Sequence, residues 1–213
     1  MKILLVAATH DEVKPLLAKL AWEESNVSHE AYNHQLTLLV AGVGMVSTAF
    51  SMGTKLALEQ FDLAINLGIA GAFDRSLKLG EVVEVKSDQL SEMGAEDGEK
   101  FLSLAELGMA EPREFIFENV YAIEHQLKTV RGITVNTVHG KEASIELINK
   151  RLNPQVESME GAAFFNACKM ANTSALQLRA ISNYVEARNK SNWKIDLAVD
   201  NLATETLAIL KQL

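Results

Sequence analysis

Two small polar residues, Ser182 and Asn183, directly follow an apolar run at residues 176–181. The run contains Leu176 and Leu178 and is typical of a buried strand. In open α/β sheets, polar side chains at the carboxyl end of such a strand are presented to a ligand. The alternative is that both residues only shape a turn or cap the next helix.

Two glutamates lie where an apolar stretch and a predicted helix meet. Glu12 comes just after an apolar run at residues 3–8, and Glu160 precedes an apolar helical stretch. A carboxylate can act as a general base, and acids are rarely buried without a partner or a role. The alternatives are that Glu12 only suits the helix dipole and that Glu160 is an exposed first-turn residue.

Two glycine-bounded turns follow predicted strands, at residues 42–44 and 68–71. Glycines at such turns let a ligand approach the backbone closely. As a dinucleotide-binding signal, Gly42-Val43-Gly44 is weak, because Ser47 occupies the third glycine position and the motif follows the second strand.

Strands and helices alternate along the chain. The hydrophobic pattern predicts strands at 3–8, 36–41, 62–67, 80–85 (half-exposed), 133–138 and 176–181. It predicts helices from about 9 to 20, at 46–60, at 141–151, after Glu160 and at 195–213. Residues 23–34 are predicted to form a loop or hairpin turn. Residues 86–119 are the most loop-like part, typical of a lid, a binding loop or an oligomer contact. The alternation predicts an α/β fold: one domain, residues 1–213, with helices on both faces of a mainly parallel sheet.

The composition restricts the partners. A formal net charge of −8 and the lack of a basic block argue against nucleic acid and against a membrane surface. The first apolar run is too short for a signal sequence or a membrane span. Cys168 is the only cysteine, which favours a reducing compartment, and we expect a cytoplasmic protein. The five histidines lack metal-ligand spacing.

Four separated segments together resemble one known family. They are Glu12, Gly68-Ile-Ala-Gly71, Ser158-Met-Glu-Gly161 and Arg179-Ala-Ile-Ser-Asn183. Their order and spacing are similar to those of the nucleoside phosphorylase/nucleosidase family, over nearly the whole chain. Residues 92–103, 156–163 and 181–186 resemble its futalosine hydrolase branch.

The resemblance implies a fold and an assembly. The fold would be a three-layer α/β/α sandwich whose central mixed sheet is partly barrel-like. Members are usually homo-oligomers in which a neighbouring subunit often helps to close the site. The resemblance implies a small nucleoside as the substrate, with no cofactor and no metal.

It also implies roles for individual residues. Glu12 would orient and deprotonate water, and Glu160 would accept hydrogen bonds from the ribose hydroxyls while Met159 packs against the sugar. Backbone amides near Ile69 and Ala70, and the turn that contains Gly44, would lie near the ribose and the water. The base pocket would also draw on residues 136–140.

The residues themselves favour water over phosphate as the nucleophile. Phosphate needs Arg or Lys donors, and no arginine occurs before Arg75. Glu12 would repel a phosphate in the same place.

Position 183 distinguishes the bases. Relatives that cleave adenine carry Asp at the matching position, which can protonate N7 of the purine. The carboxamide of Asn183 can only donate to N7 and to a 6-oxo group, with Ser182 and Arg179 holding Asn183 and the strand end in place. The prediction is a hydrolase that releases hypoxanthine from futalosine in menaquinone biosynthesis.

Other functions stay open on the sequence. The chain could be a methylthioadenosine/S-adenosylhomocysteine nucleosidase, a purine nucleoside phosphorylase, or a nucleoside-binding protein without turnover. Asn183 could be a turn residue only. Arg75, Lys78, Arg188 and Lys190 are candidates for binding the distal carboxylate of futalosine, and the sequence does not choose among them.

Overall fold

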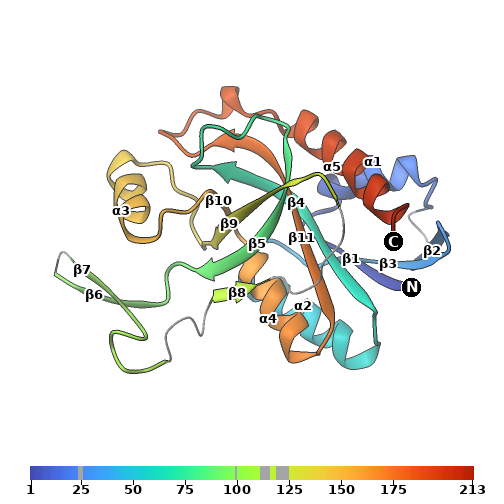
Figure 1. Cartoon of the computed structure of the whole chain (residues 1–213), viewed down its shortest axis with the longest axis horizontal. Coiled ribbons are helices and arrows are strands. Elements are labelled where there is room, and N and C mark those ends of the chain that lie inside the picture. Colours follow the sequence, from blue (N-terminus) through green and yellow to red (C-terminus); the bar gives the residue numbers. More distant parts are fainter. Residues whose placement is uncertain (24–25, 99, 111–115, 119–124) are drawn as a thin grey trace.

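A computed structural model describes residues 1–23, 26–98, 100–110, 116–118 and 125–213. Helices cover both faces of a central sheet (Figure 1). On one face, α1 (His10–Lys19) and α5 (Ile195–Leu210) pack against one set of strand side chains. On the other face, α2 (Met45–Leu58) and α4 (Gly161–Met170) cover the alternate set. The three-layer α/β/α prediction is confirmed.

The sheet is mixed and mainly parallel, in the order β10-β9-β5-β11-β4-β1-β3-β2. Its strands are β1 (Lys2–Ala7), β2 (Ser28–Ala31), β3 (His34–Val40), β4 (Leu63–Ala72), β5 (Val82–Leu90), β9 (Lys128–Thr134), β10 (Val156–Ser158) and β11 (Ser174–Tyr184). A short strand, β8 (Ile116–Glu118), pairs with β5. Because β10 also pairs with β4, the strands β4, β11, β5, β9 and β10 form a closed ring. The predicted barrel-like character is therefore present on one side of the sheet.

The carboxyl ends of the parallel strands meet at one edge. In the register, Ala7 of β1 lies opposite Leu67 of β4, and Leu178 of β11 also lies opposite Leu67. Chain segments that follow these points therefore emerge side by side, although they are far apart in the sequence. These segments carry most of the predicted site residues.

Strand β11 is longer than its apolar core suggests. It continues through Asn183 to Tyr184, so Ser182 and Asn183 lie inside the strand and not after it. The register with β4 shifts between Ile181 and Asn183, which marks Ser182 as the extra residue of a β-bulge. A bulge re-aims the side chains that follow it, and such irregularities often lie next to functional sites.

The expectations for residues 80–119 were partly wrong. Strand β5 runs to Leu90, and its first four residues are buried, because β9 and β11 flank it in the closed ring. The region predicted to be a loop also forms a hairpin of β6 (Gly94–Asp97) and β7 (Lys100–Ser103), which projects from the body beside α3 (Glu142–Leu152) (Figure 1). Residues 99, 111–115 and 119 of the predicted loop lie outside the described residues.

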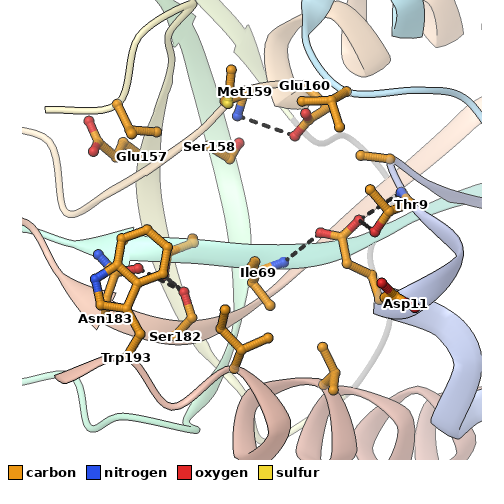
Figure 2. Close-up of a pocket in the computed structure, with 18 of the residues that line it drawn as sticks. Thr9, Asp11, Ile69, Glu157, Ser158, Met159, Glu160, Ser182, Asn183 and Trp193 are labelled. Carbon is orange, nitrogen blue, oxygen red and sulfur yellow. Dashed lines mark hydrogen bonds between the residues drawn. The ribbon is translucent and has the colours of Figure 1, made fainter. Parts of the chain in front are cut away.

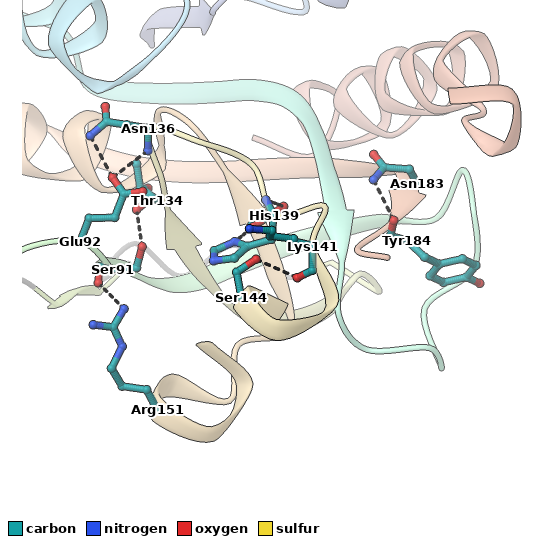
Figure 3. A network of polar contacts seen from close by, with 11 residues as sticks. Ser91, Glu92, Thr134, Asn136, His139, Lys141, Ser144, Arg151, Asn183 and Tyr184 are labelled. Carbon is teal, nitrogen blue, oxygen red and sulfur yellow. Dashed lines mark hydrogen bonds and ion pairs between the residues drawn. The ribbon is translucent and has the colours of Figure 1, made fainter. Parts of the chain in front are cut away.

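The base of this hairpin is fixed to α3 by Arg151 (Figure 3). Its guanidinium donates to the Ser91 carbonyl at 2.7 Å and lies 3.7 Å from the centre of the Phe101 ring. Nearby, the side chain of Glu92 accepts hydrogen bonds from the backbone and side-chain amides of Asn136. The hairpin is thus attached by polar contacts and stacking, without entering a hydrophobic core. Among the described helices, none is both long and apolar enough to cross a membrane.

Candidate active site

A cavity of about 630 Å³ opens at the strand edge where β1, β4, β10 and β11 end. Ile69 lies near its middle, with Thr9 on one side and Ser182 and Asn183 on the other, and Ser158 to Glu160 face them (Figure 2). The polar or charged side chains in its lining are Thr9, Asp11, Glu12, Lys14, Glu157, Ser158, Glu160, Ser182, Asn183, Arg188, Trp193 and Asp196.

Glu12 is held in position at the start of α1. Its Oε2 accepts hydrogen bonds from the backbone N–H of Thr9 at 3.0 Å and from the Thr9 hydroxyl at 3.1 Å. Its Oε1 accepts from the backbone N–H of Ile69 at 3.2 Å. The capping contacts explain why a glutamate stands three residues after Thr9, and they also fix one carboxylate oxygen over the end of β4. The structural interpretation of Glu12 as a helix-start residue therefore holds, and the same carboxylate lines the cavity, where its role as a base stays a prediction.

Glu160 is the residue before α4 and is nearly buried, with 9% of its surface exposed. Its Oε1 accepts from the backbone N–H of Gly44 at 2.9 Å, and Oε2 accepts from the N–H of Met159. Burial raises the pKa of this carboxyl, and nearby Glu12 adds to the rise, whereas Arg179 and the Gly44 amide act against it. Glu160 is therefore a largely buried side chain in the cavity wall, and the alternative that it is an exposed first-turn residue is wrong.

Arg179 is a buried positive charge that interacts with both glutamates. It is 1% exposed and is absent from the cavity lining. A Cβ placed on Gly68 would lie 3.0 Å from Glu12 Oε1 and 3.3 Å from Arg179 Nη1, so the two side chains meet beneath that glycine. Burial lowers the pKa of Arg179, and Glu160, Glu12 and Asp88 oppose this effect. The sequence interpretation placed Arg179 as a support for Asn183, but the structure places it under the two carboxylates.

The amide of Asn183 is oriented by its neighbours. The Ser182 hydroxyl lies 2.8 Å from Asn183 Oδ1 and 3.3 Å from the carbonyl of Ala70, and its one proton suits the shorter contact. Asn183 Nδ2 donates one hydrogen to the carbonyl of Tyr184 at 3.0 Å. The other Nδ2 hydrogen is available to a molecule in the cavity.

The sequence interpretation did not identify Glu157, which lines the same end of the cavity as Asn183. It is 3% exposed, and it also lines a small annex together with Asn183, His139 and Trp193. Its Oε1 accepts a hydrogen bond from the backbone N–H of His139 at 3.0 Å, and its Oε2 lies 2.6 Å from His139 Nδ1. A glutamate between the buried Val156 and Ser158 is the signal that could have revealed it.

The predicted site residues are mostly brought together. The cavity is lined by Glu12, Ile69, Ala70, Met159, Glu160, Ser182 and Asn183. Gly44 contributes its backbone N–H to Glu160 while its neighbour Val43 lines the cavity. Of the predicted region 136–140, Val138 lines the main cavity and His139 the annex.

Acidic groups outnumber basic ones in the cavity wall. Its charged residues are Asp11, Glu12, Glu157, Glu160 and Asp196 against Lys14 and Arg188. Of the four cations that the sequence offered for a distal carboxylate, only Arg188 lines the cavity. Negative surroundings favour a centre that becomes positive and disfavour an entering anion. Within the described ranges, no group of three or more His, Cys, Asp or Glu side chains could hold a metal ion.

Comparisons with known proteins identify the family of the chain. The family model "Phosphorylase superfamily" matches residues 2–213, and the chain belongs to that superfamily. The chain is 28% identical to the futalosine hydrolase of Thermus thermophilus over 184 residues, which cover 82% of this chain and 80% of that protein. It is 31% identical to the Streptomyces coelicolor futalosine hydrolase over 173 residues, covering 76% and 73%.

A second group of relatives has another named activity. The 5′-methylthioadenosine/S-adenosylhomocysteine nucleosidase of Bacillus cytotoxicus is 27% identical over the full length of both chains. Among solved structures, the Streptococcus pneumoniae nucleosidase with a transition-state inhibitor superposes with a TM-score of 0.79 at 23% identity, covering 100% of this chain and 99% of that one. The Helicobacter pylori futalosine hydrolase also gives 0.79, at 14% identity, covering 100% and 98%. These superpositions show the same fold.

The position of Arg179 predicts a large loss of stability on substitution. Arg179→Met would leave three acidic side chains without their shared counter-charge, so we expect the free energy of unfolding to fall by about 3–5 kcal/mol. Denaturant unfolding followed by circular dichroism measures this. The matched control is Arg75→Met, which removes an exposed ion pair with Glu186 and should change little. Equal effects of the two substitutions would contradict the role given to Arg179.

Proposed function

We propose that the protein is an N-ribosyl hydrolase that cleaves futalosine into hypoxanthine and dehypoxanthine futalosine in menaquinone biosynthesis. The relatives named futalosine hydrolase support this assignment. The main supporting observation is that Asn183 and Glu157 lie together at one end of the cavity. Glu12 and Glu160 line the same cavity.

In this proposal the base end of the cavity recognises a 6-oxopurine by polarity. A 6-oxopurine carries two adjacent polar groups, the acceptor O6 and the donor N1–H. A 6-aminopurine has the opposite pattern, with a donor amino group at position 6 and an acceptor at N1. The one free Nδ2 hydrogen of Asn183 is a donor that O6 and N7 would share, and each carboxylate oxygen of Glu157 keeps a second lone pair as an acceptor. An adenine in the same position would oppose donor to donor and acceptor to acceptor, at a cost of about 1–3 kcal/mol for each mismatched group.

Glu12 activates the water. Its Oε2 is occupied by two donors from Thr9. Among the described residues, Oε1 accepts a hydrogen bond from the Ile69 amide alone, so Oε1 is the oxygen that accepts a further proton. A carboxylate held by three hydrogen bonds at the end of β4 orients water toward the anomeric carbon and removes its proton as the new bond forms.

Glu160 binds and stabilises the ribose. Its carboxylate accepts hydrogen bonds from the 2′- and 3′-hydroxyls, and Met159 packs against the sugar. The ribosyl ring gains positive charge as the bond to the base breaks, and nearby Glu160, Glu12 and Asp196 favour that charge over the neutral ground state. Because hypoxanthine leaves as a weakly basic group, the hydrogen bond from Asn183 is enough, and no acid is needed at that position.

The methylthioadenosine/S-adenosylhomocysteine nucleosidases are the second candidate, because one such relative aligns over the full length. The carboxamide at Asn183 disfavours it. A phosphorylase is disfavoured by the cavity wall, where five acidic side chains accompany only Lys14 and Arg188 as cations.

We also propose a homo-oligomer in which a second copy covers the face of α2. Val43, Val46 and Phe50 lie on or just before this helix and are 55%, 78% and 76% exposed. Val43 also lines the cavity. An apolar stripe that continues into the rim of a binding cavity is typical of an interface that completes the site. A second copy is the occupant, as the family resemblance implies.

The cytoplasm is the proposed compartment. Cys168, the sole cysteine of the chain, is free and buried. Burial raises the pKa of its thiol to about 12, so the group stays protonated and inert. A chain that uses no disulfide suits a reducing environment.

Replacement of the proposed general base, Glu12, should greatly slow turnover of futalosine while leaving its binding intact. For Glu12→Gln we expect hypoxanthine release from futalosine, followed by chromatography, to fall by about 10²–10⁴-fold in kcat. The control is Asp11→Asn, which neutralises the adjacent carboxylate in the same cavity wall and should keep most of the rate. An undiminished rate in Glu12→Gln would remove the water-activation step.

A carboxylate at position 183 should change the preferred base. With Asn183→Asp we expect kcat/KM for futalosine to fall by about 10–100-fold and the rate on 5′-methylthioadenosine to rise, since mismatches of 1–3 kcal/mol are exchanged between the substrates. Competing-substrate assays measure the ratio. The control Asn166→Asp makes the same charge change on the exposed side of α4 and should leave the ratio unchanged. An unchanged ratio in Asn183→Asp would contradict base selection by Asn183.

A charge on the apolar stripe should dissociate the oligomer. Phe50→Glu would place a carboxylate in the proposed interface, and we expect monomers by sedimentation velocity together with lower activity. Leu147→Glu is the control, because Leu147 is 65% exposed on α3, away from the stripe. A native protein that is already monomeric would refute the interface.

A further inference from the structure

Three polar side chains are buried beneath the first turn of α4, outside the cavity lining. They are Asp88 of β5, Thr134 of β9 and Gln177 of β11, and they are 1%, 0% and 0% exposed. The chemistry proposed above uses none of them. Buried polar groups destabilise a fold unless hydrogen bonds compensate for their lost hydration, so a buried cluster of this kind calls for an explanation.

The three side chains form one connected network. The Thr134 hydroxyl donates to Asp88 Oδ1 at 2.7 Å, and Gln177 Nε2 donates to Asp88 Oδ2 at 2.8 Å. The Thr134 oxygen accepts in turn from the backbone N–H of Ala162 at 2.7 Å. The peptide of Ala162 belongs to the first turn of α4, two residues after Glu160. Asp88 thereby joins three neighbouring strands to the start of the helix that carries Glu160.

The contact between this network and the helix is close. A Cβ placed on Gly161 would lie 2.0 Å from Asp88 Oδ2 and 2.5 Å from Gln177 Oε1. Only glycine allows the backbone to approach the carboxylate in this way. The helix start therefore rests directly on Asp88, and a displacement of the carboxylate moves the backbone beside Glu160.

We infer that Asp88 is a positioning residue that, through Thr134, sets the first turn of α4 and so aims Glu160 at the ribose hydroxyls. This inference rests on the proposed function, because it assigns the ribose to Glu160. The hydrogen of the Thr134 hydroxyl is committed to Asp88, so the Thr134 oxygen is fixed as an acceptor for the helix amide. Without Asp88 the hydroxyl could rotate, and the helix start would lose a fixed partner.

The electrostatics of the site agree with this geometry. Burial raises the pKa of Asp88 to about 6, and the hydrogen bonds from Gln177 and Thr134 and the charge of Arg179 act against the rise. Arg179 also lies beside Glu160 and Glu12. The positioning network and the two acids of the cavity therefore share one counter-charge.

Thr134 offers the sharpest test, because two substitutions separate its hydroxyl from its shape. Thr134→Val removes the hydroxyl and keeps the volume, and Thr134→Ser keeps the hydroxyl and is the matched control. The readout is the preference for a ribose over a 2′-deoxyribose, since the 2′-hydroxyl is a group that Glu160 would bind. Calorimetry with inosine and 2′-deoxyinosine, in protein that also carries Glu12→Gln, measures this preference without turnover.

In the Glu12→Gln protein with Thr134 unchanged, we expect inosine to bind at least about tenfold more tightly than 2′-deoxyinosine. A hydrogen bond to a charged group contributes a difference of this size. Thr134→Val should reduce that ratio at least about threefold, and Thr134→Ser should restore it. Asp88→Asn should keep most of the ratio, because its oxygen still accepts from Thr134. Its amide faces Gln177 Nε2, and a turn of the Gln177 amide by 180° would bring the unpartnered Oε1 to accept from it.

A purely structural role would lower stability and leave the ratio unchanged. An unchanged ratio in folded Thr134→Val, or a native ratio near one, would overturn the inference. If Thr134→Val does not fold, Asp88→Ala takes its place, because it removes the acceptor that fixes the Thr134 hydroxyl. A ratio reduced at least about threefold in folded Asp88→Ala would support the inference, and an unchanged ratio would overturn it. Native protein that shows the expected ratios but releases no hypoxanthine from futalosine would refute the proposed hydrolase and leave the positioning role intact.

Discussion

The site depends on one buried guanidinium. Two carboxylates in one cavity repel each other, and burial raises the pKa of Glu160, so the pair needs a nearby positive charge to compensate. Arg179 supplies that charge from beneath the cavity floor, where it is 1% exposed. Its only hydrogen bond within the described residues goes from Nη1 to the carbonyl of Leu178, and its Nε has no partner. The guanidinium therefore depends on charge, rather than on a full set of hydrogen bonds, to compensate for burial.

The arrangement of the sheet makes this sharing possible. Arg179 lies on β11, Glu12 follows β1, and Glu160 follows β10, and these strands all adjoin β4. Small residues in β4 remove side-chain volume where the groups meet: Gly68 lies between Glu12 and Arg179, and Gly71 lies between Glu157 and Asn183. The glycine-bounded turn of the sequence is thus part of a strand, and its glycines make room for side chains from other strands.

Much of the fold and part of the site could be predicted from the sequence. Alternation of apolar strands with amphipathic helices is a local signal, and it gave the layers and most elements to within a few residues. Strand β5 was expected to be half-exposed, because the alternation of residues 80–85 does not reveal that two further strands enclose it. The role of Arg179 under the two acids was also missed, since it depends on register between distant strands. Glu157 was overlooked because Glu160, three residues on, gave the more familiar signal.

The bulge at Ser182 explains why the sequence could mark Asn183 as a candidate site residue but could not predict the direction of its side chain. The sequence marks the change from apolar to polar residues after Ile181, whereas the extra residue in the ladder exists only relative to β4. Asn183 acquires its orientation from that irregularity and from the Ser182 hydroxyl. Local composition therefore identified the residue, and pairing across the sheet decided its direction.

The closed ring of β4, β11, β5, β9 and β10 also bears on how the chain is made. Strand β4 emerges from the ribosome early, but two of its three partners, β10 and β11, lie at residues 156–158 and 174–184. Until they are synthesised, β4 has an unpaired, largely apolar edge of the kind that adheres to other nascent chains. The residues from β10 to the start of α5 therefore complete the proposed catalytic groups and also cover that edge. A product truncated before them would be prone to aggregation and would lack part of the proposed site.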